Sequence, residues 1–489
     1  MVTIDAICPA PTFALLNRGA PVTGSAWKAP SSRIAKFTRS EQYRAQTPIG
    51  SPTAVAQSVR RPPTPPEDEV PVLCPAKLRV VGERPGKTQG MSRLRVLVVV
   101  LAGGRGSRLG PLTAGRAKPS LPVGGNYRLI DIALSNATHS GLSDVWVLQQ
   151  YEPHLLAEHL AGGRPWDLDR TRGGFRILAP FEGPPKDGFA SGNADALIRN
   201  WPVIDAFDPD VLLVCSADHL LTLDLRTVIG THLDAGADAT VVTTILPRGT
   251  DVSRYLVVQA ADGRVRSVDY KPDGPAGRCV GTEVFAYRPD VLAEQLRDLH
   301  REGELGDYGE RLLPRLVTEG VVAEVRHDGH WRDLGTPTAY LDGQLELLRD
   351  RPPMRLDDPD WPILTSMPVR GPAVVRRTAT LDRAALAPAA DVAGEVVNSV
   401  IGPGVVIERG ASVRHSVLMD DVVVRSGAAV ARSVIAEGSV IGRRARLGAV
   451  NAVHPVLVGS HRRIAADAEL GPGTEVEPRR PRDLIRRSR

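Results

Sequence analysis

The strongest constraint on the fold is a repeat of 17 residues near the C-terminal end of the chain. It recurs as Asn398-Ser-Val-Ile401, His415-Ser-Val-Leu418 and Arg432-Ser-Val-Ile435. Aliphatic residues return every six positions, at Ile401, Ile407, Val413, Leu418, Val424, Val430, Ile435, Ile441 and Leu447, with turn glycines such as Gly404, Gly410, Gly427 and Gly442. Such hexads are typical of a parallel β-helix, although the period is one residue short of three hexads and a β-sandwich fits it poorly. We therefore expect a β-helix over residues 392–478, and its stacking coils favour oligomers.

A second constraint lies near residue 100, where an apolar run meets a cluster of glycines. Val96–Val100 is short, β-branched and uncharged, which predicts a strand buried on both faces. The next stretch, Leu101-Ala-Gly-Gly-Arg-Gly-Ser-Arg-Leu109, allows close backbone approach to a ligand and adds two arginines that suit phosphate oxygens. Neither Gly-Lys-Ser/Thr nor GxGxxG occurs in this turn. The pattern indicates a nucleotide-triphosphate cradle, with a tight β-turn as the structural alternative.

Residues 91–345 alternate strand-like and helix-like segments. The expected strands include Asp144–Leu148, Val211–Cys215 and Ala239–Ile245, and the expected helices include Asn193–Phe207 and Asp224–Ala235. This alternation predicts a mostly parallel sheet flanked by helices, with ligands at the carboxyl ends of its strands. The glycine turn after Val100 and Asp218 after Cys215 both lie at such ends.

The remaining segments have compositions of their own. Residues 1–90 are rich in Pro, Ser, Ala and Arg, which predicts a disordered extension. A transit peptide is one interpretation, and a true translation start at Met91, five residues before the first strand, is the one we favour. We expect a linker over residues 346–391 and a basic tail over residues 479–489.

Composition excludes several classes of protein. The chain has 489 residues, enough for two or three domains, and its 42% hydrophobic and 24% charged residues are ordinary for a globular protein. Four cysteines without metal-ligand spacing predict a cytoplasmic location, and no apolar run nears the ~20 residues that cross a bilayer. The net charge of +5 suggests nucleic-acid binding as a function. We exclude it because the excess lies largely near the two ends and only 4% of residues are aromatic.

The motifs after the glycine turn carry a resemblance to a known family. Arg116-Ala-Lys-Pro119, Tyr127-Arg-Leu-Ile-Asp131 and Ala133-Leu-Ser-Asn136 follow in close order, and together they resemble glucose-1-phosphate adenylyltransferases among the sugar-phosphate nucleotidyltransferases. The resemblance implies a Rossmann-like α/β nucleotidyltransferase domain followed by a left-handed parallel β-helix. It also implies an enzyme that uses ATP and glucose 1-phosphate to make ADP-glucose and pyrophosphate for glycogen or α-glucan synthesis, and that works as a homotetramer.

The implied reaction needs alignment, charge neutralisation and a divalent metal, for which we expect Mg²⁺, but no protein nucleophile. By resemblance, Arg108 holds the leaving phosphates and Lys118 contacts phosphate near the reaction centre. Asp218, after a buried strand, and Asp333, in Trp331-Arg-Asp-Leu-Gly-Thr336, match the family's metal ligands. The structural alternative for Arg108 and Lys118 is a surface cation. For Asp218 it is a helix cap, and for Asp333 it is a turn.

The same resemblance assigns the binding residues. Gly192-Asn-Ala-Asp-Ala196 resembles the loop that reads the base, Lys271 matches the lysine that holds the sugar phosphate, and Asp307-Tyr-Gly309 matches a short motif. The expected nucleotide-binding residues are Leu101, Ala102, Gly103, Gly104, Gln150, Gly192, Asn193 and Ala194. The expected sugar-phosphate residues are Lys271, Gly281, Glu283 and Asp333. Arg116 and Arg128 are expected to hold a phosphorylated effector.

Several positions depart from the family pattern. The family's Glu-Lys-Pro is Tyr270-Lys-Pro here, its Ser-x-Gly-x-Tyr is Cys279-Val-Gly-Thr-Glu283, its Phe/Tyr-Gly is Tyr255-Leu256, its Trp-Tyr is Phe189-Ala190, and its Gly-Asp-His is Ala217-Asp-His. Changed hydroxyl partners alter sugar discrimination, so glucose is less firmly predicted than ATP. Gly115 replaces a lysine before Arg-Ala-Lys-Pro, which predicts weaker or altered control by an effector such as fructose 1,6-bisphosphate.

Two alternatives remain open. One is an enzyme for another sugar 1-phosphate, such as that of glucosamine or mannose. The other is a catalytically weak regulatory subunit. The chain retains five residues expected at the active site, which argues against the regulatory subunit, because a purely regulatory chain does not need all five. They are Arg108, Lys118, Asp218, Lys271 and Asp333.

Overall fold

The computed structural model describes residues 94–479 except 105, 172, 180–189, 191, 304 and 368. The expectations for the 1–90 extension, the Met91 start, Phe189 and residues 480–489 of the basic tail fall outside this part. Within it, no helix combines the length and the apolar character that spanning a membrane requires.

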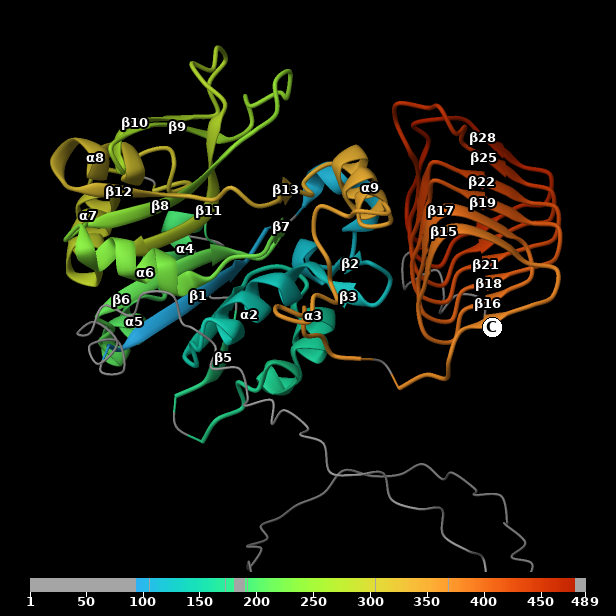
Figure 1. Ribbon diagram of the computed structural model, residues 1–489, viewed down its shortest axis with the longest axis horizontal. Coiled ribbons are helices and arrows are strands. Elements are labelled where there is room, and N and C mark those ends of the chain that lie inside the picture. Colours follow the sequence, from blue (N-terminus) through green and yellow to red (C-terminus); the bar gives the residue numbers. More distant parts are fainter. Residues whose placement is uncertain are drawn as a thin grey trace, which may run out of the picture. The chain divides into compact units, whose positions relative to one another are not determined.

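The first domain is built on one nine-stranded sheet (Figure 1). Its order is β5 (Phe175–Leu178), β4 (Val145–Gln149), β1 (Val96–Ala102), β6 (Val211–Ser216), β11 (Cys279–Tyr287), β8 (Ala239–Ile245), β12 (Val322–Arg326), β10 (Arg264–Tyr270) and β9 (Leu256–Ala261). Only β11 and β10 run against the others, so the predicted mostly parallel sheet is confirmed.

Helices cover both faces of this sheet, and β1 shows why its sequence is apolar throughout. Val98, Val100 and Ala102 pack in one buried cluster with α2 (Leu129–His139), α3 (Pro153–Leu160) and α6 (Leu225–Asp234). Leu97, Val99 and Leu101 pack in a second cluster with α4 (Asn193–Arg199), α5 (Trp201–Phe207), α7 (Pro289–Glu302) and α8 (Leu312–Glu319). Because successive side chains of a strand point to opposite faces, a strand between two helical layers is apolar at every position.

The predicted helix over residues 193–207 is wrong in one respect, because it is two helices. The chain breaks at Asn200, between α4 and α5. Pro202 lies in the first turn of α5, where its ring is tolerated, but it could not continue α4 without losing a backbone hydrogen bond. The predicted helix over residues 224–235 is confirmed as α6, and the Asp224 carboxylate caps it by accepting a bond from the Arg226 amide at 2.9 Å.

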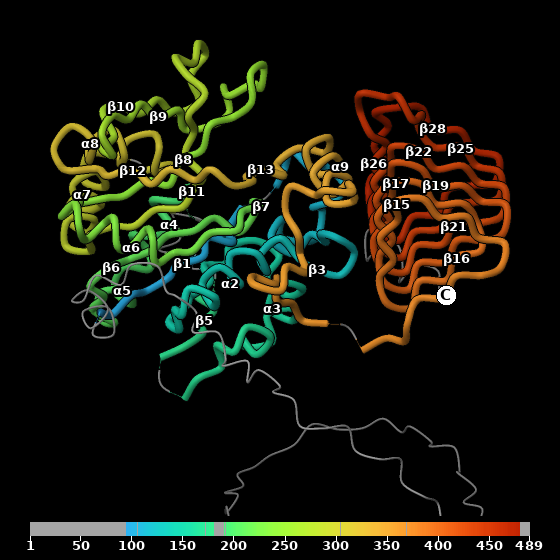
Figure 2. The backbone as a smooth tube through the Cα atoms, viewed as in Figure 1, coloured from blue at the N-terminus to red at the C-terminus, as the bar shows by residue number. Residues whose placement is uncertain are grey.

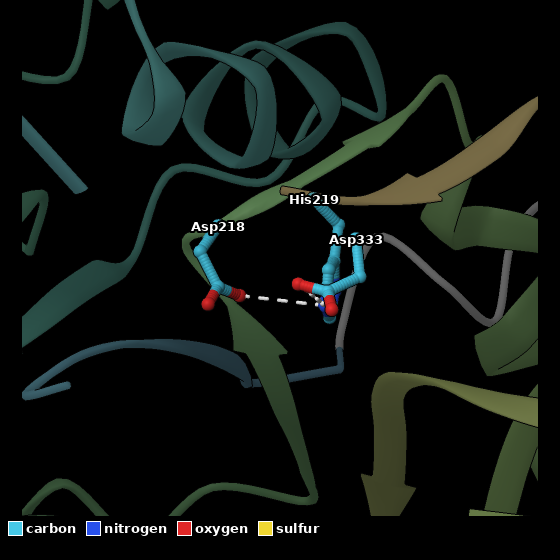
Figure 3. A group of neighbouring side chains, drawn as sticks. All are labelled: Asp218, His219 and Asp333. Carbon is cyan, nitrogen blue, oxygen red and sulfur yellow. Dashed lines mark ion pairs between the residues drawn. The ribbon is translucent and has the colours of Figure 1, made fainter. Parts of the chain in front are cut away.

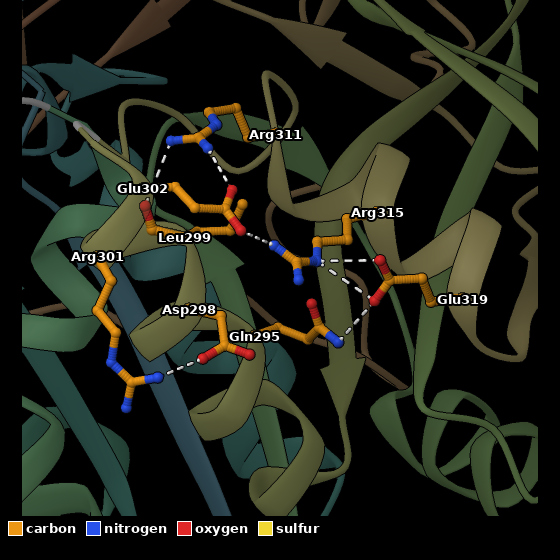
Figure 4. Close-up of polar contacts among 8 residues, drawn as sticks. All are labelled: Gln295, Asp298, Leu299, Arg301, Glu302, Arg311, Arg315 and Glu319. Atoms are coloured by element: carbon orange, nitrogen blue, oxygen red, sulfur yellow. Dashed lines mark hydrogen bonds and ion pairs between the residues drawn. The ribbon is translucent and has the colours of Figure 1, made fainter.

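Charged side chains link α7 and α8 on the surface (Figure 4). Arg315 pairs with Glu302 of α7 at 2.7 Å and with Glu319 of its own helix at 3.2 Å, and Arg311 also pairs with Glu302 at 2.7 Å. The two carboxylates are about half exposed, so these pairs contribute little stability. The leucines that both helices bury against the sheet therefore fix their packing.

The second domain is the predicted β-helix, whose coils stack with a 17-residue offset (Figure 2). Parallel pairs join Val400 to Val417 and Val417 to Val434 on one face, and Val406 to Val423 on another. The next coil is longer, because Val434 pairs with Leu457. The first strands are β14 (Val374–Val375) and β15 (Thr380–Leu386), so the coils begin inside the segment expected to be a linker.

A ladder of buried serines explains the recurring motif. Ser399, Ser416 and Ser433 are fully buried, and each follows a residue in the left-handed region, with φ of 45° at Asn398, 49° at His415 and 43° at Arg432. The Ser399 hydroxyl accepts a bond from the Ser416 amide at 3.0 Å, and the Ser416 hydroxyl accepts one from the Ser433 amide at 3.1 Å. Each hydroxyl also donates to the carbonyl two residues earlier. The serines thus satisfy amides that a tight corner would leave without partners.

One face of the β-helix packs on the first domain. Val400, Val417, Val434 and Leu457 belong to one buried cluster with residues of the first domain, which are Leu109, Leu112, Leu121, Leu129, Tyr340 and Leu341. Arg432 adds an ion pair to Asp342 of α9 (Pro337–Glu346) at 2.9 Å. The β-helix therefore packs against the segment around Leu109 and Leu112, which directly follows the glycine turn.

Candidate active site

The predicted cradle is a turn at the carboxyl end of β1, an interior strand of the sheet. Gly106 adopts a φ of 65° before a short 3-10 helix, η1 (Ser107–Leu112), whose first turn presents the exposed Arg108. A Cβ on Gly103 would lie 2.9 Å from the Gln150 side chain, so the amide of Gln150 packs directly against the turn. The turn therefore brings the backbone of Gly103 and Gly104, the Gln150 amide and the Arg108 guanidinium to one edge of the sheet.

An open pocket lies beside this turn. Its lining includes eight residues that the sequence predicted, namely Gly104, Arg108, Asn193, Asp218, Lys271, Gly281, Glu283 and Asp333. Several strands contribute to it, because β6, β10 and the short β13 (Trp331–Asp333) end here, β9 begins here and β11 passes through. Residues that are far apart in the chain thus converge on one cavity.

The centre of the site is acidic, with a lysine between its carboxylates. The Lys118 ammonium lies 2.5 Å from an Asp218 oxygen and 3.4 Å from an Asp333 oxygen, and only 5% of Lys118 is exposed. Burial alone would lower the pKa of Lys118, but the two carboxylates outweigh it and raise that pKa. Burial would raise the pKa of Asp218, yet Lys118 and His219 hold it well below its usual range. At neutral pH the centre therefore holds an ionised aspartate beside a charged lysine.

His219 completes this centre (Figure 3). One ligand atom from each of Asp218, His219 and Asp333 lies within 4.8 Å of the others. The antiparallel pair formed by β7 (His219–Leu221) and β13 sets this spacing, since it places Asp333 directly opposite His219. Two carboxylates on a partly open pocket, with room for water and phosphate oxygens, fit a hard divalent cation. Asp218 and Asp333 are the better donors for such an ion, because Mg²⁺ prefers oxygen to nitrogen.

Lys271 occupies a second part of the pocket, near Tyr270 and Asp307. The Tyr270 hydroxyl donates to an Asp307 oxygen at 2.6 Å, and the Lys271 ammonium lies 3.6 Å from the same oxygen and 4.2 Å from the centre of the Tyr270 ring. Burial and the bond to Asp307 raise the pKa of Tyr270, so its phenol stays protonated. A Cβ on Gly309 would lie 2.2 Å from the Tyr270 ring, which explains the glycine of the Asp307-Tyr-Gly309 motif.

The predicted base loop forms the N-terminal turn of α4. A Cβ on Gly192 would lie 2.2 Å from the Gly306 carbonyl, so only glycine allows this approach. The Asn193 amide donates to Asp307 at 3.3 Å, while Ala194 is buried in α4. Asp307 therefore links the loop expected to read the base with the lysine expected to hold the sugar phosphate.

The predicted effector residues lie in a different place. Arg116 and Arg128 line a separate cleft between the nucleotidyltransferase domain and the β-helix. Arg116 pairs with Glu437 at 2.5 Å, and Arg128 pairs with Asp420 at 3.2 Å. Both carboxylates belong to the β-helix, and all four side chains are at least three-quarters buried. Each arginine expected to bind an anion thus already faces a carboxylate of this chain.

Sequence reasoning gave no role to His219 or Arg254, although both line the pocket. His219 directly follows Asp218, and that adjacency was the available signal. Arg254 lines the pocket next to Tyr255, which packs edge-on against Trp331 with ring centres 5.3 Å apart. The sequence contains no local pattern that would mark Arg254, because a lone arginine after a loop is ordinary.

Other motif residues hold the scaffold. Asp131 is fully buried, accepts from the Arg128 amide at 2.7 Å and lies 2.6 Å from the His159 ring. The Asn136 amide donates to the Leu221 carbonyl at 2.7 Å, which anchors the end of β7 beside the acidic centre. These residues explain why the signature extends beyond the groups that can touch substrate.

Comparison with known proteins follows the same division into two domains. A family model described as nucleotidyl transferase matches residues 97–350, and one described as GlmU-like, C-terminal hexapeptide matches residues 384–479. The glucose-1-phosphate adenylyltransferase of Thermotoga neapolitana is 38% identical over 323 residues, which span 65% of this chain and 76% of that protein. The enzyme of the same name from Thermomicrobium roseum is 40% identical over 341 residues, 64% of this chain and 79% of that protein.

Fold and site together define a nucleotidyltransferase that carries a left-handed β-helix, a class of enzyme that uses divalent metal ions. Within this class, the chain belongs to the glucose-1-phosphate adenylyltransferase family. The resemblance drawn from the motifs between Leu101 and Asn136 is thereby confirmed.

Proposed function

We propose that the chain transfers the adenylyl group of ATP to glucose 1-phosphate for glycogen or α-glucan synthesis. The carrying observation is the pocket that unites Arg108, Lys271 and the acidic pair Asp218 and Asp333. A phosphate oxygen of the sugar forms a bond to the α-phosphorus, and the bond from that phosphorus to the bridging oxygen breaks. Pyrophosphate leaves with the electron pair, and ADP-glucose is the second product.

The residues divide between charge neutralisation and positioning. Asp218 and Asp333 would hold Mg²⁺, and a bound ion would supply neutralisation of the phosphate charge and of the charge that develops on the transferred group. Arg108 lies beside Asp333, since a Cβ on Gly335 would be 3.1 Å from its guanidinium and 2.8 Å from the carboxylate, and it binds the leaving phosphates. Lys118, fixed by both carboxylates, contacts the phosphate at the reaction centre.

The two substrates occupy opposite sides of this centre. The turn Leu101–Gly104, Gln150 and the loop Gly192–Ala194 bind the nucleotide, with Gly192 and Gln150 close to the base. Lys271 binds the sugar phosphate, while Gly281 and Glu283 line the space for the sugar ring. A Cβ on Gly281 would lie 3.1 Å from Leu256, so this glycine keeps that space open.

Location, assembly and control complete the proposal. The free thiols of Cys215 and Cys279 suit the reducing cytoplasm. Homotetramer formation is supported by exposed apolar side chains on the first coil, where Val374 and Val375 are 40% and 51% exposed. A phosphorylated effector binds Arg116 and Arg128 by displacing their carboxylate partners, which predicts a weak response to it.

The test is Mg²⁺-dependent release of pyrophosphate from ATP and glucose 1-phosphate by the full chain. Asp218→Asn removes one carboxylate of the centre, and Asp350→Asn, at an exposed position, is the matched control. We expect release by the wild type and by Asp350→Asn, with a loss of at least a hundredfold in Asp218→Asn. Release with another sugar 1-phosphate but not with glucose 1-phosphate would overturn the assigned sugar. Folded protein that releases no pyrophosphate with any sugar phosphate would overturn the assigned catalysis.

A further inference from the structure

Asp218 lies on a short link between two strands. β6 ends at Ser216, which pairs with β1, and β7 begins at His219, which pairs with Asp333 of β13. Ala217 and Asp218, between these strands, belong to neither of them. Strand pairing therefore fixes the residues on either side of Asp218, whereas the orientation of its carboxylate depends on what the side chain itself contacts.

Each oxygen of the Asp218 carboxylate receives a short hydrogen bond. The Ser216 hydroxyl donates to Oδ1 at 2.5 Å, and the Lys118 ammonium donates to Oδ2 at 2.5 Å. The His219 ring nitrogen lies 3.5 Å from Oδ1, which is too far for a strong bond. The torsion that turns an aspartate carboxylate has broad minima, so a single donor leaves the group free to rotate. Two donors on different oxygens hold it in one plane, and an ionised carboxylate still has acceptor sites left for a cation.

The two donors to Asp218 differ in what else they do in the proposed reaction. The Lys118 ammonium contacts the phosphate at the reaction centre, so substrate competes with Asp218 for its protons. Ser216 ends a strand in the interior of the sheet, and its hydroxyl does not depend on substrate. When phosphate draws the ammonium away, the bond from Ser216 still holds the carboxylate.

We infer that Ser216 is a positioning residue of the reaction, whose hydroxyl fixes the rotation of the Asp218 carboxylate and keeps it oriented for the divalent ion during adenylyl transfer. This inference rests on the proposed function, since it concerns the ion that the proposed reaction needs. Ser216 does not line the active-site pocket itself, so it acts through Asp218 and not on substrate.

The test compares Ser216→Ala and Ser216→Thr with the wild type in the full chain. Titration with Mn²⁺ alone, followed by electron paramagnetic resonance, should show about tenfold lower affinity in Ser216→Ala, because a hydrogen bond to a charged group is lost. At saturating Mg²⁺, kcat for pyrophosphate release should fall about tenfold, with both substrate KM values within about twofold. Ser216→Thr keeps the hydroxyl, and a cavity of about 20 Å³ beside Ser216 leaves room for its methyl group. Its affinity and kcat should stay within about threefold of the wild type.

Ser412→Ala is the matched control in the β-helix. The Ser412 hydroxyl donates to the Glu395 carboxylate at 2.7 Å, and Arg414 pairs with the same carboxylate at 2.7 Å. The same three kinds of group, a serine, a carboxylate and a cation, thus meet outside the active-site pocket. Ser412→Ala should lower the melting temperature slightly and leave the Mn²⁺ affinity and kcat unchanged. A purely structural hydroxyl is thereby separated from one that orients a metal ligand.

Several results would overturn the inference. Unchanged Mn²⁺ affinity and kcat in Ser216→Ala would do so, and so would equal losses in Ser216→Thr, since the size of the side chain and not its hydroxyl would then matter. A wild type that binds no Mn²⁺ would overturn it as well. The Mn²⁺ titration needs no turnover, which keeps this test separate from the proposed function. Tighter binding by an inactive wild type than by Ser216→Ala supports the positioning role although the assigned catalysis fails, and equal binding by both refutes that role.

Discussion

Replacing Lys118 with methionine tests the balance of charge in the acidic centre. The change keeps an unbranched side chain that is one atom shorter and removes the ammonium that lies 2.5 Å from Asp218 and 3.4 Å from Asp333. The two carboxylates then face each other with ligand atoms within 4.8 Å, and their repulsion at an effective dielectric constant of ~20 is about 3 kcal/mol. Removing one partner from a buried ion pair costs a similar amount. The melting temperature should therefore fall by about 5–10 °C.

Thermal unfolding in EDTA and in millimolar Mg²⁺ measures this effect. We expect the full loss in EDTA and a larger recovery with Mg²⁺ in Lys118→Met than in the wild type, because the ion replaces the missing positive charge. Pyrophosphate release should still fall by about a hundredfold or more, since the ion cannot also supply the contact of Lys118 to phosphate. Lys118→Arg retains the charge and serves as the control. A melting temperature in EDTA equal to that of the wild type would refute the reasoning.

Three further predictions concern other parts of the molecule. Gly192→Ala places a Cβ 2.2 Å from the Gly306 carbonyl, so the KM for ATP should rise about tenfold or more in steady-state kinetics. An unchanged KM for ATP would contradict this packing. Burial lowers the pKa of His232 to about 4, so the unfolded chain binds a proton first, and stability should fall by up to about 3 kcal/mol between pH 6.5 and 4. Urea unfolding across this range should show a flatter profile for His232→Gln. Glu437→Gln removes the carboxylate that pairs with Arg116, so titration with fructose 1,6-bisphosphate should show half-activation at about a tenfold lower concentration. An unchanged concentration would show that Glu437 does not compete with the effector for Arg116.

Periodicity predicted the parallel β-helix and the mostly parallel sheet, while the left hand of the helix came from the family resemblance. The hexad spacing fixed which side chains face inward in the β-helix, and the fully apolar β1 indicated a strand between two helical layers. The break at Asn200 was missed because it depends on one proline in a segment whose apolar spacing continues on both sides. A proline ends a helix in its interior but is tolerated in its first turn, so its effect can be predicted only when the start of the helix is known.

The acidic centre was predicted in part. Motif resemblance assigned Lys118, Asp218 and Asp333 separately, but no pattern in the chain states that the lysine lies between the two carboxylates. That arrangement follows from the pairing of β7 with β13. The register between β11 and β8 shifts between Gly281 and Phe285, and the sequence did not predict this either, since the residues around the shift continue an ordinary strand pattern. The carboxylates opposite Arg116 and Arg128 come from the β-helix, and only tertiary packing brings them there.

The serine ladder has a consequence for how the β-helix can change in length. The Ser416 hydroxyl bonds to the coil above it, so deleting a single residue between Ser416 and Ser433 would move a left-handed corner off its position and turn an inward valine outward. Growth or shortening is therefore quantised, in whole coils that each change the height of the stack by about 4.8 Å. The segment between Val434 and Leu457 already departs from the spacing without breaking the pairing on either side. An inserted peptide or a fused domain has its natural point of entry there.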